Sequence, residues 1–204
     1  MKKLLENKNR LVIGLTGSFG TGKTTVAGLL REKGCKVVDA DSIGHDLLKS
    51  GTTVYKKIAA YFGNAVLDKE KAIDRRALSH IVFADDEKLK ALNAIIHPEI
   101  IKKIKSEMSK VRKGVVVLDA PLLLEAGLQG LTDKIIVVTA TRANQIKRVQ
   151  ARLRLSKSAI NRRLRIQMPL GDKVRMADFI IDNNGSLSDL KKQVEEIRRK
   201  WWTS

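Results

Sequence analysis

Residues 17–24 read Gly-Ser-Phe-Gly-Thr-Gly-Lys-Thr, and their types and spacing are suited to binding phosphate. They match G-x-x-x-x-G-K-[ST], in which the glycines let the backbone turn its N–H groups toward an anion. The apolar run 11–15 predicts a strand before this segment, and 24–33 predicts a helix whose N-terminal dipole end adds positive potential. We therefore predict a nucleotide site, with Lys23 at the β- and γ-phosphates and the Thr24 hydroxyl as a ligand of Mg²⁺.

Three acidic side chains stand where predicted strands end, at Asp39, Asp41 and Asp119. Ligands of open α/β sheets bind at the carboxyl ends of the strands. Asp119 follows the apolar run 115–118, so we predict that it holds Mg²⁺, directly or through water. Asp41 opens the next segment and is the better candidate to accept a proton from an acceptor hydroxyl. Helix capping is the alternative for Asp39 and Asp41, because Ser42 begins a helical pattern.

Arg148 and Arg152 lie four residues apart and therefore share one face of a predicted helix, with Gln145 one turn earlier. Guanidinium groups brought in by a lid would neutralise charge on a transferring phosphoryl group and exclude water. A basic surface helix is the alternative, and the spacing does not decide between the two.

Five short apolar runs, rich in β-branched residues, predict strands that are buried on both faces. They are LVIGLT (11–16), KVVDA (36–40), VVVLDA (115–120), KIIVVTA (134–140) and DFIIDN (178–183). Helical patterns separate them. This alternation predicts an α/β fold with a doubly wound, five-stranded parallel sheet.

The spacing of these runs predicts the domain organisation. About seventy residues separate the second and third strands, far more than a single crossover helix needs. We predict that 42–113 is an inserted helical substrate-binding domain. The arginine-rich helical stretch 142–170 is predicted to be a lid. The nucleotide-binding core then consists of 1–41, 114–141 and 171–204.

The composition favours anionic partners. The 204 residues include 40 Lys and Arg against 22 Asp and Glu, a formal net charge of +18. Nucleic acid, a membrane surface and phosphorylated small molecules all fit such a charge. Aromatic residues make up only 4% of the chain, which leaves little material for stacking bases. The sequence shows no apolar stretch of roughly 18 residues, no signal-peptide pattern and no cysteine partner for Cys35. These features predict a cytoplasmic location.

From Leu11 to about Ile197 the chain resembles the dephospho-coenzyme A kinase family. Phosphate loops of this kind occur in many families, so the later motifs and their order carry the resemblance. These are Val38-Asp-Ala-Asp41, His97-Pro98, Asp119-Ala-Pro-Leu-Leu-Leu-Glu125, and Ala177-Asp178 leading to Asn183-Asn184-Gly185. Ser18-Phe19 and Thr21 depart from the commoner Gly-Ile and Ser, with little expected effect, because the backbone faces the phosphate there.

The resemblance implies a P-loop kinase core and the last step of coenzyme A biosynthesis. In that step the γ-phosphoryl group of ATP, a co-substrate bound with Mg²⁺, moves to the ribose 3′-hydroxyl of dephospho-coenzyme A. The implied catalytic residues are Asp41, Lys23 and Arg148. The implied ATP contacts are Gly17, Gly20, Thr21, Gly22, Lys23, Thr24, Thr25, Arg152, Asn183 and Asn184. The implied acceptor contacts are Asp41, His97, Pro121, Leu122 and Glu125, and the implied metal ligands are Thr24 and Asp119. No nucleic acid, membrane or obligatory protein partner is expected.

Two other functions fit parts of the sequence. A kinase of another small hydroxyl compound would share the phosphate loop and the lid, and would differ within 42–113. A nucleic-acid-binding protein that uses ATP as a switch would account for the net charge of +18. Turnover of a nucleoside monophosphate would favour the first, and salt-sensitive RNA or DNA binding that stimulates ATP hydrolysis would favour the second.

Overall fold

The computed structural model describes residues 9–153 and 155–201. Residues 1–8 and 202–204, which we assigned to the core, and Arg154 of the predicted lid lie outside the described residues. The chain divides into two compact units, each of which is described by itself. The core unit comprises Met1–Val38 and Lys110–Ser204, and the inserted unit comprises Asp39–Ser109.

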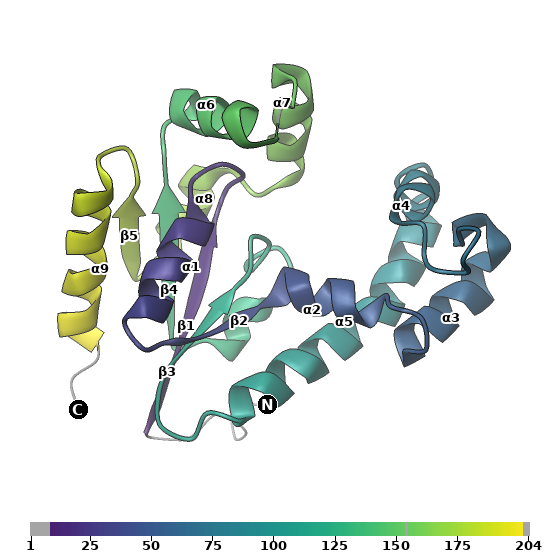
Figure 1. The fold of residues 1–204 in the computed structure, drawn as a ribbon, viewed down its shortest axis with the longest axis horizontal. Helices are drawn as coiled ribbons and strands as arrows, with labels where there is room; N and C mark the ends of the chain where they lie inside the picture. The colour runs from purple at the N-terminus through teal and green to yellow at the C-terminus, as the bar shows by residue number, and fades with distance from the viewer. Residues whose placement is uncertain (1–8, 154, 202–204) are drawn as a thin grey trace. The chain divides into compact units, whose positions relative to one another are not determined.

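A five-stranded sheet forms the centre of the core unit within the described residues, in the order β2-β3-β1-β4-β5 (Figure 1). β1 pairs in parallel with β3 and β4, and β4 pairs in parallel with β5. The strands are β1 (Arg10–Gly17), β2 (Lys36–Asp39), β3 (Gly114–Asp119), β4 (Lys134–Thr139) and β5 (Phe179–Asp182). The predicted α/β sheet is thus confirmed. Continuous apolar runs mark these strands because both faces of the sheet are covered.

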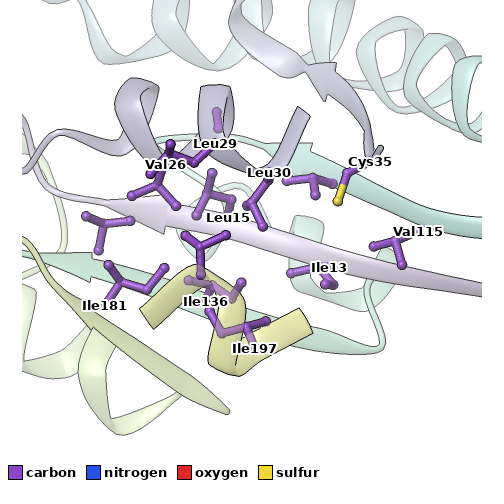
Figure 2. Packing of buried hydrophobic residues seen from close by; sticks show 14 of the residues in the cluster. Ile13, Leu15, Val26, Leu29, Leu30, Cys35, Val115, Ile136, Ile181 and Ile197 are labelled. Atoms are coloured by element: carbon purple, nitrogen blue, oxygen red, sulfur yellow. The ribbon is translucent and has the colours of Figure 1, made fainter. Parts of the chain in front are cut away.

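Side chains from one face of the sheet and from two helices make the main hydrophobic core (Figure 2). Ile13 and Leu15 alternate with residues of the opposite face, as the period of two in a strand requires. Leu30 of α1 (Lys23–Glu32) and Ile197 of α9 (Leu187–Trp201) pack into the same cluster and are fully buried. This packing fixes the start of α1, and with it the phosphate loop, against the carboxyl end of β1.

The remaining helices of the core unit follow β3 and β4. They are η3 (Leu128–Leu131), α6 (Arg142–Leu153), α7 (Lys157–Ile166) and α8 (Leu170–Arg175). Within the stretch predicted to be a lid, α7 begins after Ser156, whose hydroxyl accepts a hydrogen bond from Ala159 N at 3.2 Å. Such an N-cap satisfies one of the backbone N–H groups that a helix start leaves unpaired.

The inserted unit is helical, like the segment 42–113 in which we predicted the insert. It contains α2 (Ala40–Leu47), α3 (Thr53–Phe62), η2 (Gly63–Val66), α4 (Arg75–Phe83) and α5 (Asp86–Ser109). Its own core brings together Val54, Ile58, Val66, Leu78 and Val82. Thr52 caps α3 and Asp74 caps α4, so the sequence itself marks where these helices begin. No helix in the described part of either unit has the length and apolar character that crossing a membrane requires.

Candidate active site

The phosphate loop joins the end of β1 to the start of α1. Gly20 and Gly22 have φ values of 85° and 88°, a left-handed conformation that glycine adopts without strain. The loop is also pinned from within, because the Thr21 hydroxyl donates a hydrogen bond to Ser18 O at 2.9 Å. A Cβ atom at Gly22 would lie 2.1 Å from Asn183 Nδ2, so no larger residue fits there. The loop backbone that we predict to bind phosphate therefore requires glycine at positions 20 and 22.

Lys23 and Asp119 form an ion pair beside this loop. The parallel register places Leu15 opposite Asp119, which brings the end of β3 next to the end of β1. Both side chains are largely buried, 15% and 8% exposed, so their charges are weakly screened by water. An ammonium group and a carboxylate thus meet at the edge where ligands of α/β sheets bind.

The residues at this edge fit Mg²⁺. Across residues 9–153 and 155–201 there is no group of three or more His, Cys, Asp or Glu side chains that could form a metal cage. Mg²⁺ bound with a nucleotide does not need one, since it takes one or two protein oxygens and completes its shell with phosphates and water. The Asp119 carboxylate and the Thr24 hydroxyl, in the first turn of α1, supply that kind of donor set.

Arg148 of α6 reaches the phosphate loop. Its Nη2 donates a hydrogen bond to Asn183 O at 2.7 Å. Its Nη1 is buried and has no hydrogen-bond partner in the described part of the chain, and it lies 3.9 Å from where a Cβ of Gly22 would be. A buried guanidinium N–H without a partner is costly, and an anionic oxygen at the loop would satisfy it. Arg152, four residues later, is exposed in the last turn of the same helix.

Asn183 and Asn184 connect the end of β5 to the phosphate loop and to α6. Asn183 Nδ2 donates to Thr21 O at 2.8 Å, and Asn183 N donates to Thr139 O at 2.9 Å. Asn184 Oδ1 accepts a hydrogen bond from Thr141 N at 2.8 Å. Asn183 therefore stabilises the phosphate loop through its contact with Thr21 O. The contact of both residues with the adenine of ATP stays a prediction.

The segment after β3 holds the acceptor residues expected in the core unit. Leu122 is 45% exposed. The Pro121 carbonyl accepts hydrogen bonds from the Thr16 hydroxyl at 3.0 Å and from Lys173 Nζ at 2.7 Å. Glu125 forms an ion pair of 2.9 Å with Lys173. These contacts fix the segment, and its contact with an acceptor stays a prediction.

The two acids of the second strand end take different positions in the inserted unit. Asp39 is the N-cap of α2, and its carboxylate accepts a hydrogen bond from Ser42 N at 3.0 Å. Asp41 lies in the first turn of α2 and is exposed. Asp39, and not Asp41, is therefore the residue that caps α2. His97 is exposed on α5, directly before Pro98. The roles of Asp41 and His97 stay predictions.

One residue of this region had no place among the sequence predictions. Lys173 is fully buried and holds both Pro121 and Glu125. It stands in a stretch, 142–175, with eleven Lys and Arg residues against one acid. No feature of the sequence distinguishes it from its neighbours. Cys35 is buried, and burial raises the pKa of its thiol to about 12, so the thiol is protonated at neutral pH.

The sequence profile of the family described as Dephospho-CoA kinase matches residues 11–189. The chain belongs to the dephospho-CoA kinase family. A dephospho-CoA kinase from Bacillus licheniformis is 46% identical over 194 residues, which cover 94% of this chain and 96% of the relative. One from Carboxydothermus hydrogenoformans is 42% identical over 193 residues, with 93% and 94% covered. Family membership confirms the function expected from the sequence, phosphorylation of dephospho-coenzyme A with ATP.

Solved structures agree with this membership. A crystal structure from Thermus thermophilus has a TM-score of 0.86 at 35% identity, covering 96% of this chain and all of that one. Dephospho-CoA kinase from Campylobacter jejuni has a TM-score of 0.69 at 33% identity, covering 94% and 96%. Shikimate kinase from Bacteroides thetaiotaomicron, at 14% identity and a TM-score of 0.53, shares the fold alone. The likeness to dephospho-CoA kinases thus extends over residues 11–189 and is not confined to the phosphate loop.

Proposed function

We propose that this enzyme transfers the γ-phosphoryl group of ATP to the ribose 3′-hydroxyl of dephospho-coenzyme A through the residues gathered at the phosphate loop. The observation that carries the proposal is Arg148 Nη1, a buried donor beside Gly22 that has no hydrogen-bond partner among the residues the structure describes. Charge on a transferring phosphoryl group is spread over its equatorial oxygens, and a fixed guanidinium stabilises that charge. Asn183 O holds the other nitrogen of the same guanidinium at 2.7 Å, so its direction is set before the substrate binds.

Lys23 and the loop amides hold the phosphates in this proposal. No side chain of the described chain caps α1, which leaves the first N–H groups of that helix facing the loop. Lys23 exchanges Asp119 for the β- and γ-phosphates when ATP binds. Asp119 and Thr24 would hold Mg²⁺, and the bound ion would neutralise part of the phosphate charge.

On the acceptor side, Asp41 accepts the proton of the 3′-hydroxyl, supported by its place in the first turn of α2 and by the separate use of Asp39 as the cap. His97, Pro121 and Leu122 contact the acceptor, and the exposed Leu122 offers an apolar surface to it. ATP and dephospho-coenzyme A are thus the partners we propose, with the cytoplasm, where ATP is abundant, as the location.

The test is to incubate the purified protein with Mg-ATP and dephospho-coenzyme A and to follow ADP and coenzyme A together. Equal amounts of both products are expected. ADP without coenzyme A would point to hydrolysis or to another acceptor hydroxyl. Equal turnover of a nucleoside monophosphate would overturn the assignment of the acceptor.

A further inference from the structure

Lys173 is a charged side chain at a fully buried position, with 0% of its side chain exposed. Lysine is almost never fully buried unless it is paired, because removing an ammonium group from water is costly. It lies on α8, a helix of six residues, and none of the roles proposed above uses it.

The ammonium group of Lys173 joins two points of the segment that follows β3. It donates to Pro121 O at 2.7 Å and to Glu125 Oε2 at 3.2 Å, and it lies 2.9 Å from Glu125 Oε1. An ammonium group has three N–H donors, and these three oxygens can take all of them. The segment 121–125 is therefore held at both of its ends by one cation.

The same carboxylate also holds the chain where the lid returns to the core. Glu125 Oε1 accepts a hydrogen bond from Met168 N at 2.9 Å. The neighbouring Gln167 accepts one from Phe19 N of the phosphate loop through its Oε1 at 2.8 Å. A continuous set of contacts thus runs from Lys173 through Glu125 to the end of the lid and on to the phosphate loop.

We propose that Lys173 is a positioning residue for the acceptor, and that Glu125 acts by holding residues 121–125 and 167–168 in place and not by contacting the acceptor. Both carboxylate oxygens of Glu125 are engaged, by Lys173 and by Met168 N. Charge-assisted contacts in a buried place fix geometry more tightly than apolar packing, because an unpaired charge there is expensive. Phosphoryl transfer depends on such positioning, since small displacements of a bound reactant slow the reaction strongly.

The kinetic test compares Lys173→Met, Glu125→Gln and the double variant, and it rests on the proposed function. Each single change is expected to raise the KM for dephospho-coenzyme A about tenfold, with the double variant no worse than the more severe single one. The KM for ATP is expected to change by less than about twofold, because Asn183 Nδ2 holds Thr21 O of the phosphate loop through a contact that involves neither Lys173 nor Glu125. A raised KM in Glu125→Gln alone would show that Glu125 contacts the acceptor and would overturn the proposal. Additive effects of the two changes would overturn it as well.

Lys134→Met is the matched control. Lys134 Nζ lies 2.9 Å from Asp178 Oδ1, and 42% of the Lys134 side chain is exposed. Lys134 begins β4 and therefore lies at the opposite end of the strands from the phosphate loop. The Lys134→Met change removes one positive charge and one contact with a carboxylate, as Lys173→Met does. The KM of this variant for dephospho-coenzyme A is expected to match that of the unchanged protein. A tenfold rise in this control would mean that loss of any ion pair of the core unit is felt at the acceptor, and the assignment to Lys173 would be wrong.

A second measurement needs neither a substrate nor a variant that folds. Amide hydrogen exchange of the unchanged protein should show a protected N–H at Met168, although this residue follows the end of α7 and lies outside any helix. Rapid exchange at Met168 would overturn the proposed contact network, whatever the enzyme phosphorylates. If the unchanged protein formed no coenzyme A, the proposed function would fall, and this exchange experiment would still decide on the network.

Discussion

At the residue scale, two neighbouring carboxylates do different work. Asp39 caps α2, and Asp41 lies in its first turn. Asp41→Asn should lower kcat by a factor of about 10² or more, because an amide cannot accept the proton of the acceptor hydroxyl. ATP binding should survive, since the phosphate loop is unchanged. Steady-state turnover and a nucleotide-binding titration together measure both effects.

Asp39→Asn is the control for this prediction. Asparagine caps helices about as well as aspartate, so this change removes one charge two residues away and keeps the hydrogen bond to Ser42 N. Near-normal turnover is expected. Asp41 would lose its assigned role if Asp41→Asn and Asp39→Asn reduced turnover equally.

Arg148 should not tolerate lysine. Its guanidinium uses one nitrogen for Asn183 O and presents the other at the loop, whereas a single ammonium group cannot hold both positions. Arg148→Lys should lower kcat by about 10- to 100-fold, in the range of losing one stabilising donor. Single-turnover measurements at saturating ATP would isolate this step. Arg31→Lys, on an exposed residue near the far end of α1, should leave kcat unchanged, and a loss in Arg148→Lys no larger than in this control would contradict the proposal.

At the scale of elements, the sequence predicts the strands well and the polar contacts between elements poorly. Buried parallel strands are continuous apolar runs, so β1 to β5 lie within two residues of the five predicted runs. The glycine spacing likewise marks the phosphate loop, because its left-handed positions exclude other residues. Contacts such as Asn183 with Thr21 and Lys173 with Glu125 join residues far apart in the chain. These contacts depend on how the elements pack against one another, and local sequence patterns do not predict that packing.

An ion pair also links α1 and α9, the two helices that pack on one face of the sheet. Lys33, at the end of α1, lies 3.0 Å from Glu195 of α9. Hydrogen bonds from Arg198 and Lys33 hold the pKa of Glu195 at about 2, below its ordinary value of 4.5. A carboxyl group whose pKa is lowered by folding stabilises the fold above its unfolded pKa and loses this contribution as the pH falls through the folded pKa. Stability should therefore decline between about pH 4.5 and pH 2 as Glu195 is protonated.

Glu195→Gln should lower the melting temperature at pH 7 and make its decline between pH 4.5 and pH 2 shallower. Thermal unfolding at a series of pH values measures both. Glu87→Gln is the control, because the partner of Glu87 is Lys90 on the same exposed turn of α5, at 2.8 Å. Equal curves for the two variants would mean that the pair between α1 and α9 contributes nothing to stability.

At the scale of the whole molecule, the net charge of +18 should act on substrate capture and not on the chemical step. Both proposed substrates are multiply charged anions, and a positive field raises the rate at which they arrive. Salt shortens the range of that field to about 10 Å at 0.1 M, while largely buried contacts such as Lys23 with Asp119 are screened much less. Raising the ionic strength from about 0.02 M to about 0.2 M should therefore lower kcat/KM for dephospho-coenzyme A several-fold and leave kcat nearly constant. Initial rates across that range, with sucrose as an uncharged control for solvent effects, measure this. A fall in kcat with an unchanged kcat/KM would place the effect of the charge inside the catalytic step and would contradict a role in steering.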